Sequence, residues 1–262
     1  MCESCGCNHK HDTLIRRPDT VDPAPHTAHN HVHGDGHGHD HEHEHGHGRK
    51  ILVEQAILSK NDQLAGQNRR QFQARGVIAL NLVSSPGSGK TTLLEQTLKI
   101  LKTEMPLAVI EGDQQTMHDA ERIEAVGVPA IQINTGSGCH LDADMISRAV
   151  QQLPVAERSL LFIENVGNLV CPALFDLGEE CKVVILSVTE GEDKPQKYPY
   201  MFQAAQIAVI TKTDLLPYVD FDISRAKSLA LHVNPDLRIF ELSAKTGLGM
   251  AAWLDWLRSL RA

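Results

Sequence analysis

The sequence predicts an α/β fold in which a mostly parallel sheet is covered by helices on both faces. Apolar runs rich in Val, Ile and Leu, without the alternation of a half-exposed strand, are separated by stretches of helical pattern between residues 77 and 262. Strands of this composition are typical of parallel sheets that are buried on both faces. The first apolar run also leads directly into a glycine-rich turn and a helix, which is the order of a phosphate-binding unit.

The same pattern places the individual elements. We expect strands at residues 77–83, 107–111, 130–134, 159–165, 183–189, 207–211 and 238–242. Helices are expected near residues 93–98, 117–126, 142–152, 198–206, 224–232 and 249–260. Ligands of such sheets bind beyond the carboxyl ends of the strands, so the residues that follow each strand are the first candidates for a site.

The composition divides the chain into three parts. Residues 1–48 hold a cysteine cluster and twelve of the fifteen histidines, with almost nothing apolar to bury, which predicts a disordered tail. Residues 49–76 contain no Pro and carry a helical stripe, which predicts one or two amphipathic helices packed on the core, with Gly66 as a possible break. Residues 77–262 form the α/β domain.

The net charge, the hydropathy and the cysteine content of the chain argue against several functions. A formal net charge of −8 and the lack of a Lys/Arg-rich face argue against a nucleic-acid partner. No stretch is typical of a membrane span, and residues 1–7 lack the basic and apolar regions of a secretory signal, so we expect a cytoplasmic protein with no membrane partner. Six cysteines, three of them in the first seven residues, fit a metal or redox set better than a disulfide framework.

The tail offers two groups of metal ligands. Cys2, Cys5 and Cys7 are close enough in sequence to bind one soft or borderline ion; a redox pair at Cys2 and Cys5 or an incidental cluster are the alternatives. Imidazole suits Ni²⁺, Zn²⁺ and Cu²⁺, so the tail histidines predict multidentate binding rather than a merely soluble linker. The alternating histidines are His37, His39, His41, His43, His45 and His47.

The glycine-rich turn at residues 84–92 predicts a phosphate site. Glycines let the backbone approach an anion, Lys90 can reach the β- and γ-phosphates, and the Thr91 hydroxyl can ligate Mg²⁺. The P-loop pattern asks for Gly at the first position, where this chain has Ser84, and the alternative is an ordinary flexible turn. The nucleotide-binding candidates here are Gly87, Ser88, Gly89, Lys90, Thr91 and Thr92.

Polar residues after four later strands complete the set that a guanine-nucleotide hydrolase needs. Asp113 and Glu164 are carboxylates at the phosphate end, able to hold Mg²⁺ with Thr91 and, with Lys90, to carry the catalysis. The backbone of Gly167 can approach the γ-phosphate. At the base, Asp214 can accept from the two guanine donors. The remaining base-end candidates are Lys212, Ser243, Ala244 and Lys245.

The order of these elements resembles the G1, G3, G4 and G5 elements of P-loop GTPases. Residues 164–172 and 187–195 are similar to the HypB family of hydrogenase nickel-incorporation GTPases, and the likeness covers about residues 50–262. The N-terminal cysteines and histidine tail also match bacterial members. The resemblance implies a GTPase of the SIMIBI class that forms a homodimer with nucleotide. It also implies a nickel carrier for [NiFe]-hydrogenase maturation, working with a second accessory metallochaperone and, indirectly, the hydrogenase large-subunit precursor.

One position departs from the family pattern. The fourth element usually reads Asn-Lys-x-Asp, whereas this chain has Thr211 at the first position, which puts the hydrogen bonds of that Asn in doubt. Asp214 retains the main guanine discriminator, so GTP remains the expected nucleotide.

A second metal constellation lies inside the domain. Cys139, His140 and Cys171 could supply three ligands, with a symmetric partner completing the site, although residue chemistry alone slightly favours two buried apolar cysteines. The family resemblance implies that these three residues are a metal site for nickel or zinc. Cys171 lies four residues past Gly167, so a nucleotide-dependent shift could move a metal ligand.

Two other functions stay open. The histidine tail would equally suit a nickel-storage or buffering protein in which nucleotide binding is secondary. The urease-accessory GTPase family shares the nickel logic, but its metal motif reads Cys-Pro-His, whereas Cys139 and His140 are contiguous here.

Overall fold

The structure is a computed structural model that describes residues 14–16, 46–113 and 118–260. Cys2, Cys5, Cys7 and the tail histidines up to His45 lie outside the described residues, so the predictions made for them stay predictions. His47 falls in the first turn of a helix that begins at Gly46 and so includes the last three residues of the expected tail.

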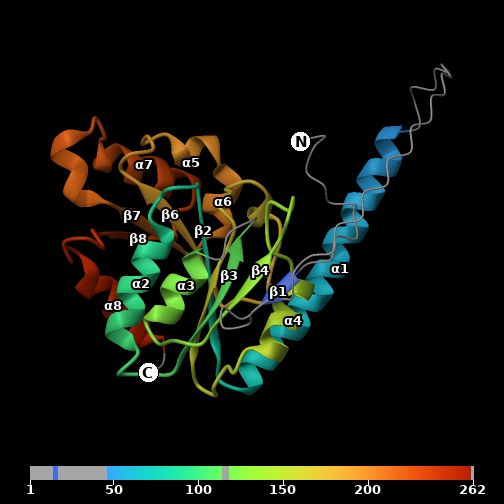
Figure 1. Ribbon diagram of the computed structural model, residues 1–262. Helices are drawn as coiled ribbons and strands as arrows, with labels where there is room; N and C mark the ends of the chain where they lie inside the picture. Colours follow the sequence, from blue (N-terminus) through green and yellow to red (C-terminus); the bar gives the residue numbers. More distant parts are fainter. Residues whose placement is uncertain (1–13, 17–45, 114–117, 261–262) are drawn as a thin grey trace, which may run out of the picture.

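A single eight-stranded sheet forms the centre of the molecule (Figure 1), in the order β1-β4-β3-β5-β2-β6-β7-β8. Among the described strands, all neighbouring pairs in the order from β4 to β8 are parallel, and β1 is antiparallel to β4. The strands are β1 Leu14–Arg16, β2 Ile78–Ser84, β3 Leu107–Asp113, β4 Ala130–Asn134, β5 Leu160–Glu164, β6 Cys181–Ser187, β7 Ile207–Thr211 and β8 Arg238–Glu241. The predicted fold class and the seven predicted strands are confirmed.

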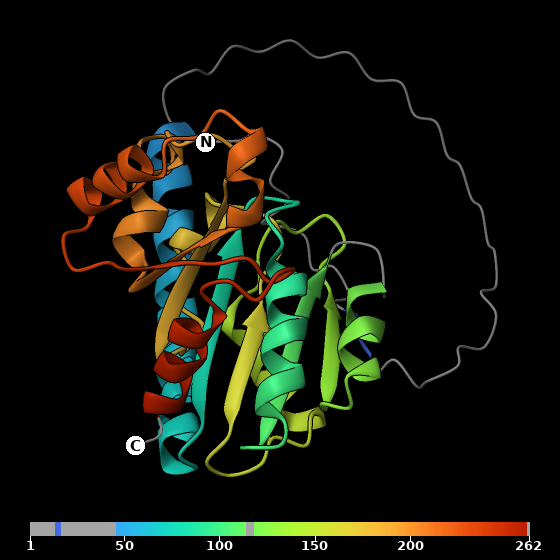
Figure 2. The same ribbon diagram turned by 90° about the vertical axis from the view of Figure 1, so that its left-hand side faces the viewer.

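Helices cover both faces of the sheet, as Figures 1 and 2 show. On one face, α2, α3 and α8 pack through residues such as Leu94, Ile123 and Trp253. On the other, α1 and α4 pack through Phe72 and Ile146. The helices are α1 Gly46–Ala74, α2 Lys90–Leu101, α3 His118–Ala125, α4 Ala143–Gln152, α5 Lys194–Lys197, α6 Pro199–Ala204, α7 Ile223–Val233 and α8 Met250–Ser259, with short 3-10 turns η1 Cys171–Ala173 and η2 Thr213–Tyr218.

Two features of the N-terminal region differ from the expectation. Helix α1 is continuous over 29 residues, so the predicted break at Gly66 is wrong. A glycine inside a helix costs only about 1 kcal/mol relative to alanine, which the packing of α1 on the sheet outweighs. Within the tail that was predicted to be disordered, Leu14–Arg16 forms the strand β1 on the edge of the sheet.

The position of β1 relates the N-terminal region to one end of the sheet. Leu14 lies opposite Asn134, the last residue of β4, and Ile15 packs against the core on the α1 side. Because β1 is antiparallel, its first residue lies at the carboxyl edge of the parallel strands, where the candidate site is found.

No helix among the described residues is long and apolar enough to cross a membrane.

Candidate functional site

A cavity of about 590 Å³ opens at the carboxyl ends of β2, β3 and β5. Nine of the predicted nucleotide and Mg²⁺ residues line it: Gly87, Ser88, Gly89, Lys90, Thr91, Thr92, Asp113, Gly167 and Lys212. Residues not proposed from the sequence also line it, among them Glu111, Gly112, Arg122, Val166 and Asn168. No sequence motif marks Arg122, because its side chain reaches the cavity from α3, the helix that connects β3 to β4.

The backbone of the glycine-rich turn has the conformations that the sequence predicts. Gly87 and Gly89 have φ values of 75° and 89°, in the left-handed region that glycine enters without strain. Gly89 is the residue that precedes α2, so the first N–H groups of that helix point into the cavity region. A helix start of this kind favours a bound anion such as phosphate.

Glu164 joins the two side chains expected at the phosphates. Its Oε1 accepts from the Lys90 Nζ at 2.7 Å and from the Thr91 hydroxyl at 2.6 Å. Glu164 is fully buried, and its Oε2 has no hydrogen-bond partner among the described residues. A buried carboxylate oxygen without a donor beside a threonine hydroxyl is a donor set that fits Mg²⁺, whose preferred ligands are oxygens.

The loop after β5 touches the glycine-rich turn. A Cβ atom at Gly167 would lie 3.0 to 3.1 Å from three atoms of Pro86, tighter than ordinary van der Waals contact. Only glycine allows the two segments to approach this closely, so a displacement of one segment would displace the other.

Thr211, the residue that departs from the family pattern, ties β7 to the same turn. Its hydroxyl donates to the Ser88 carbonyl at 2.6 Å, in a buried position. The neighbouring Lys212 has a φ of 58° and donates from Nζ to the Gly87 carbonyl at 2.7 Å. At the position where the family pattern has asparagine, this chain therefore has a threonine whose hydroxyl bonds to the backbone of the glycine-rich turn.

Of the predicted base-end residues, Lys212 lines the cavity, whereas Asp214 and residues 243–245 lie beyond its lining. Asp214 is half-buried in η2, and the adjacent Thr213 N–H donates to the Leu242 carbonyl at 3.3 Å. This bond brings the ends of β7 and β8 together, so that Ser243, Ala244 and Lys245 follow at the same edge of the sheet. Ser243 is buried, and its Oγ accepts from the Thr246 N–H at 3.2 Å, which folds the loop back on itself.

Next to the cavity, three candidate metal ligands from two segments come together. The Sγ atoms of Cys139 and Cys171 lie 3.0 Å apart, and the His140 Nδ1 is 3.6 Å from the Cys139 Sγ. All three ligand atoms lie within 4.8 Å of one another, and neither cysteine forms a disulfide. The arrangement disagrees with the interpretation of two separate buried apolar cysteines. Two thiols and an imidazole suit nickel or zinc and leave a coordination position for a further ligand.

The surroundings of His140 keep its ring available to a metal. Burial lowers the pKa of His140 below its usual range, partly offset by the charge of Asp142, so the neutral ring is favoured. Its ring centroid lies 3.9 Å from that of Phe175. Cys139 and Asn168 also line the nucleotide cavity, and Asn168 donates to the Cys139 carbonyl at 3.1 Å. The two candidate sites are therefore contiguous.

Residues 78–241 match the family model described as the CobW/HypB/UreG nucleotide-binding domain. The fold and the cavity thus define a nucleotide-binding protein of the P-loop α/β class. The chain is 60% identical over 213 residues to the hydrogenase maturation factor HypB of Azotobacter chroococcum mcd 1, covering 81% of this chain and 70% of that protein. An alignment of 317 residues with HypB of Cupriavidus necator has 46% identity and covers 98% and 88% of the two chains. The chain belongs to the HypB family of hydrogenase maturation factors.

Solved structures agree with this assignment. HypB from Archaeoglobus fulgidus is similar with a TM-score of 0.73 and 40% identity, covering 78% of this chain and 100% of that one. HypB from Helicobacter pylori in complex with nickel has a TM-score of 0.73 and 39% identity, covering 77% and 95%.

Proposed function

We propose that this protein is a GTP-hydrolysing nickel metallochaperone whose nucleotide state controls a metal site. One observation carries the proposal: Cys139 lines the nucleotide cavity and at the same time lies 3.0 Å from Cys171. Cys171 in turn follows Gly167 by four residues, and Gly167 packs against the P-loop. A γ-phosphate that moves the Gly167 loop would thus move a metal ligand directly.

The nucleotide we propose is GTP. Asp214 provides the acceptor for the two guanine donors, and Lys212 and the loop at residues 243–245 lie at the same edge of the sheet. Mg²⁺ would be held by Thr91, Asp113 and Glu164, and would supply positive charge to the phosphate oxygens.

The residues divide the work of hydrolysis between them. Lys90 would neutralise charge that develops on the transferred phosphoryl group, as the helix start does with its N–H groups. Asp113 lines the cavity, whereas Glu164 is buried beneath it with Lys90 and Thr91 as partners. This difference favours Asp113 for orienting the attacking water.

The cargo we propose is nickel, with Cys139, His140 and Cys171 as ligands. The nickel-bound HypB from Helicobacter pylori supports this choice, and the same donors accept Zn²⁺. A homodimer with GTP would supply further ligands across a symmetric interface. Transfer would proceed to a second hydrogenase accessory metallochaperone and, through it, to the hydrogenase large-subunit precursor.

The cysteines and histidines of residues 1–48 would form a second nickel store that feeds the first. The strand β1 supports this role, because its first residue, Leu14, lies at the carboxyl edge of the sheet opposite Asn134. A pure storage function is the second candidate. The urease-accessory alternative is less favoured, since the relatives at about 60% identity are named hydrogenase maturation factors.

Turnover of GTP and of ATP by purified protein, with Lys90→Ala as the control, tests the GTPase. We expect hydrolysis of GTP only, and its loss in Lys90→Ala. Equal use of ATP, or unchanged GTP turnover in the variant, would refute the proposal. Storage is tested by hydrogenase maturation in cells at ample nickel: a tail deletion that abolishes maturation while Lys90→Ala leaves it intact would establish storage as the main role.

A further inference from the structure

The three candidate metal ligands come from two separate loop segments of the chain. Cys139 and His140 lie in the loop before α4, whereas Cys171 begins the η1 turn that leads through residues 174–180 into β6. Both segments run along helix α1, which contributes none of the three ligands. The distance between them therefore depends on what holds each loop.

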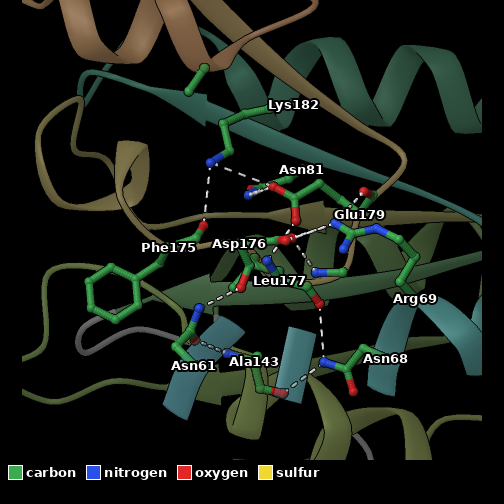
Figure 3. Close-up of polar contacts among 12 residues, drawn as sticks. Asn61, Asn68, Arg69, Asn81, Ala143, Phe175, Asp176, Leu177, Glu179 and Lys182 are labelled. Atoms are coloured by element: carbon green, nitrogen blue, oxygen red, sulfur yellow. Dashed lines mark hydrogen bonds and ion pairs between the residues drawn. The ribbon is translucent and has the colours of Figure 1, made fainter. Parts of the chain in front are cut away.

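Two buried asparagines of α1 bind both loops at once, as Figure 3 shows. Asn61 accepts from the Ala143 N–H at 2.9 Å and donates to the Asp176 carbonyl at 2.8 Å. Asn68 donates to the Ala143 carbonyl at 2.8 Å and to the Leu177 carbonyl at 3.1 Å. Each side chain thus bridges the segment after His140 and the segment after Cys171.

Their placement on the helix makes this bridging specific. Asn61 and Asn68 are 5% and 2% exposed and lie seven residues apart, which is two helical turns on one face. A helix face packed against a domain is usually apolar, because a buried amide costs free energy unless every group is satisfied. Here the hydrogen bonds of both amides go to the two loops, so they form only while both loops keep their places.

The backbone of the loop at Gly178 is in close contact with the backbone of α1. A Cβ atom at Gly178 would lie 2.6 Å from the Ala65 carbonyl and 2.8 Å from the Arg69 nitrogen. Arg69 also forms an ion pair with Asp176 at 2.7 Å, although this pair is partly exposed to solvent. The loop that follows Cys171 is therefore pressed onto one turn of α1, between the two asparagines.

Further buried groups fix the other sides of the same loops. Lys182 Nζ donates to the Pro172 carbonyl at 2.9 Å and lies 3.6 Å from Glu179, whose Oε1 also accepts from Asn81 at 3.0 Å. Asn165 accepts from the Leu141 N–H at 3.2 Å. The backbone next to each ligand is thus held by side chains from outside its own loop.

We propose that Asn61 and Asn68 are positioning residues of the metal site, which fix the Cys139–His140 pair and Cys171 relative to one another. Helix α1, expected from the sequence only to pack on the domain, is on this account part of the metal centre's support. The inference rests on the proposed function, because it takes the three residues as metal ligands. Support of this kind keeps ligands oriented before the metal arrives, and its loss typically weakens metal affinity by about 10- to 100-fold.

The test is a Ni²⁺ titration of the full chain carrying Cys2→Ser, Cys5→Ser and Cys7→Ser, so that the tail thiols do not contribute. The signal is the thiolate-to-nickel charge-transfer band that Cys139→Ala removes, which excludes the tail histidines. Asn61→Leu and Asn68→Leu remove the hydrogen bonds and keep the number of side-chain heavy atoms.

The matched control is Phe72→Ala, on the same helix and in the core but without a hydrogen bond to either loop. We expect both leucine variants to shift the band and to lose about 10-fold or more in Ni²⁺ affinity. Phe72→Ala should lower the unfolding temperature yet keep the band and the affinity.

Three results would overturn the inference. Wild-type band and affinity in folded Asn61→Leu and Asn68→Leu would do so while leaving the proposed function intact. An affinity that follows unfolding temperature alone, with Phe72→Ala as weak as the asparagine variants, would reduce the role of α1 to stability. A background protein with no Cys139-dependent band would overturn the metal site itself, and this inference with it.

Discussion

The Sγ atoms of Cys139 and Cys171 lie 3.0 Å apart, although 32 residues separate the two cysteines in the chain. Cys139 also lines the nucleotide cavity, so one side chain belongs to both candidate sites. The pair is built from the loops after β4 and β5, which the parallel sheet brings to the same edge. The candidate nucleotide and metal sites therefore share structural elements.

Glu164→Gln should abolish most GTP turnover without unfolding the domain. The amide keeps the shape of the side chain but removes the charge that faces Lys90 Nζ at 2.7 Å and the Thr91 hydroxyl at 2.6 Å. Loss of a preorganised electrostatic group typically costs about 10²- to 10³-fold in turnover. Steady-state hydrolysis with circular dichroism as the folding control measures this, and turnover within about threefold of wild type would contradict the assignment.

Thr211→Val should weaken both nucleotide binding and stability. Valine has the shape of threonine but leaves the buried Ser88 carbonyl without the 2.6 Å hydrogen bond it now accepts. A buried group left unsatisfied costs about 1–3 kcal/mol. Denaturant unfolding and GDP titration measure the two effects. Thr211→Ser keeps the hydroxyl and is the control; a serine variant as weak as the valine variant would show that the hydroxyl is not responsible.

Gly167→Ala should uncouple the loop after β5 from the glycine-rich turn. Its new methyl group would meet Pro86 at 3.0 to 3.1 Å, so the two segments must separate. We expect weaker GTP binding together with altered Ni²⁺ affinity, since Cys171 lies on the same loop. Gly127→Ala is a control for glycine replacement elsewhere, because a Cβ there meets nothing within 4 Å, although its φ of 83° carries strain of its own. Unchanged affinities for both ligands in Gly167→Ala would be inconsistent with the coupling.

Cys181 should resist alkylation in the folded domain more than the other described cysteines do. Burial raises the pKa of Cys181 to about 12, with further contributions from Glu179 and Glu180, so the reactive thiolate is scarce below that pH. Cys139 and Cys171 are only half-buried. Mass spectrometry after iodoacetamide treatment at pH 8 should show modification of Cys139 and Cys171 first. Equal rates at all three cysteines would contradict the buried placement of Cys181.

The sequence was sufficient for the parts of the fold that local patterns determine. The strands from β2 to β7 are buried apolar runs, and parallel topology then places the residues after them at one edge. The prediction for 130–134 agrees with β4 at both ends. The helix predicted at 198–206 is shorter, Pro199–Ala204, because Pro199 can only begin a helix.

Other features depend on contacts that no local pattern carries. The strand β1 has only three residues, and it forms because β4 offers a free edge. Asn61 and Asn68 have the composition of an exposed helix face, and their burial follows from the loops that pack on them. The meeting of Cys139 with Cys171 was expected from the family resemblance, whereas residue chemistry alone favoured separate burial.

The central claim is that GTP and nickel are coupled at the Cys139 site, and the most direct test is the Ni²⁺ affinity of that site in the presence of a non-hydrolysable GTP analogue and of GDP. The full chain with serine at positions 2, 5 and 7 is used, with the Cys139-dependent band as the signal. We predict that the two affinities differ by about fivefold or more, and that Ni²⁺ changes the relative affinity for the analogue and GDP by the same factor. Equal Ni²⁺ affinities in protein saturated with either nucleotide would contradict the account.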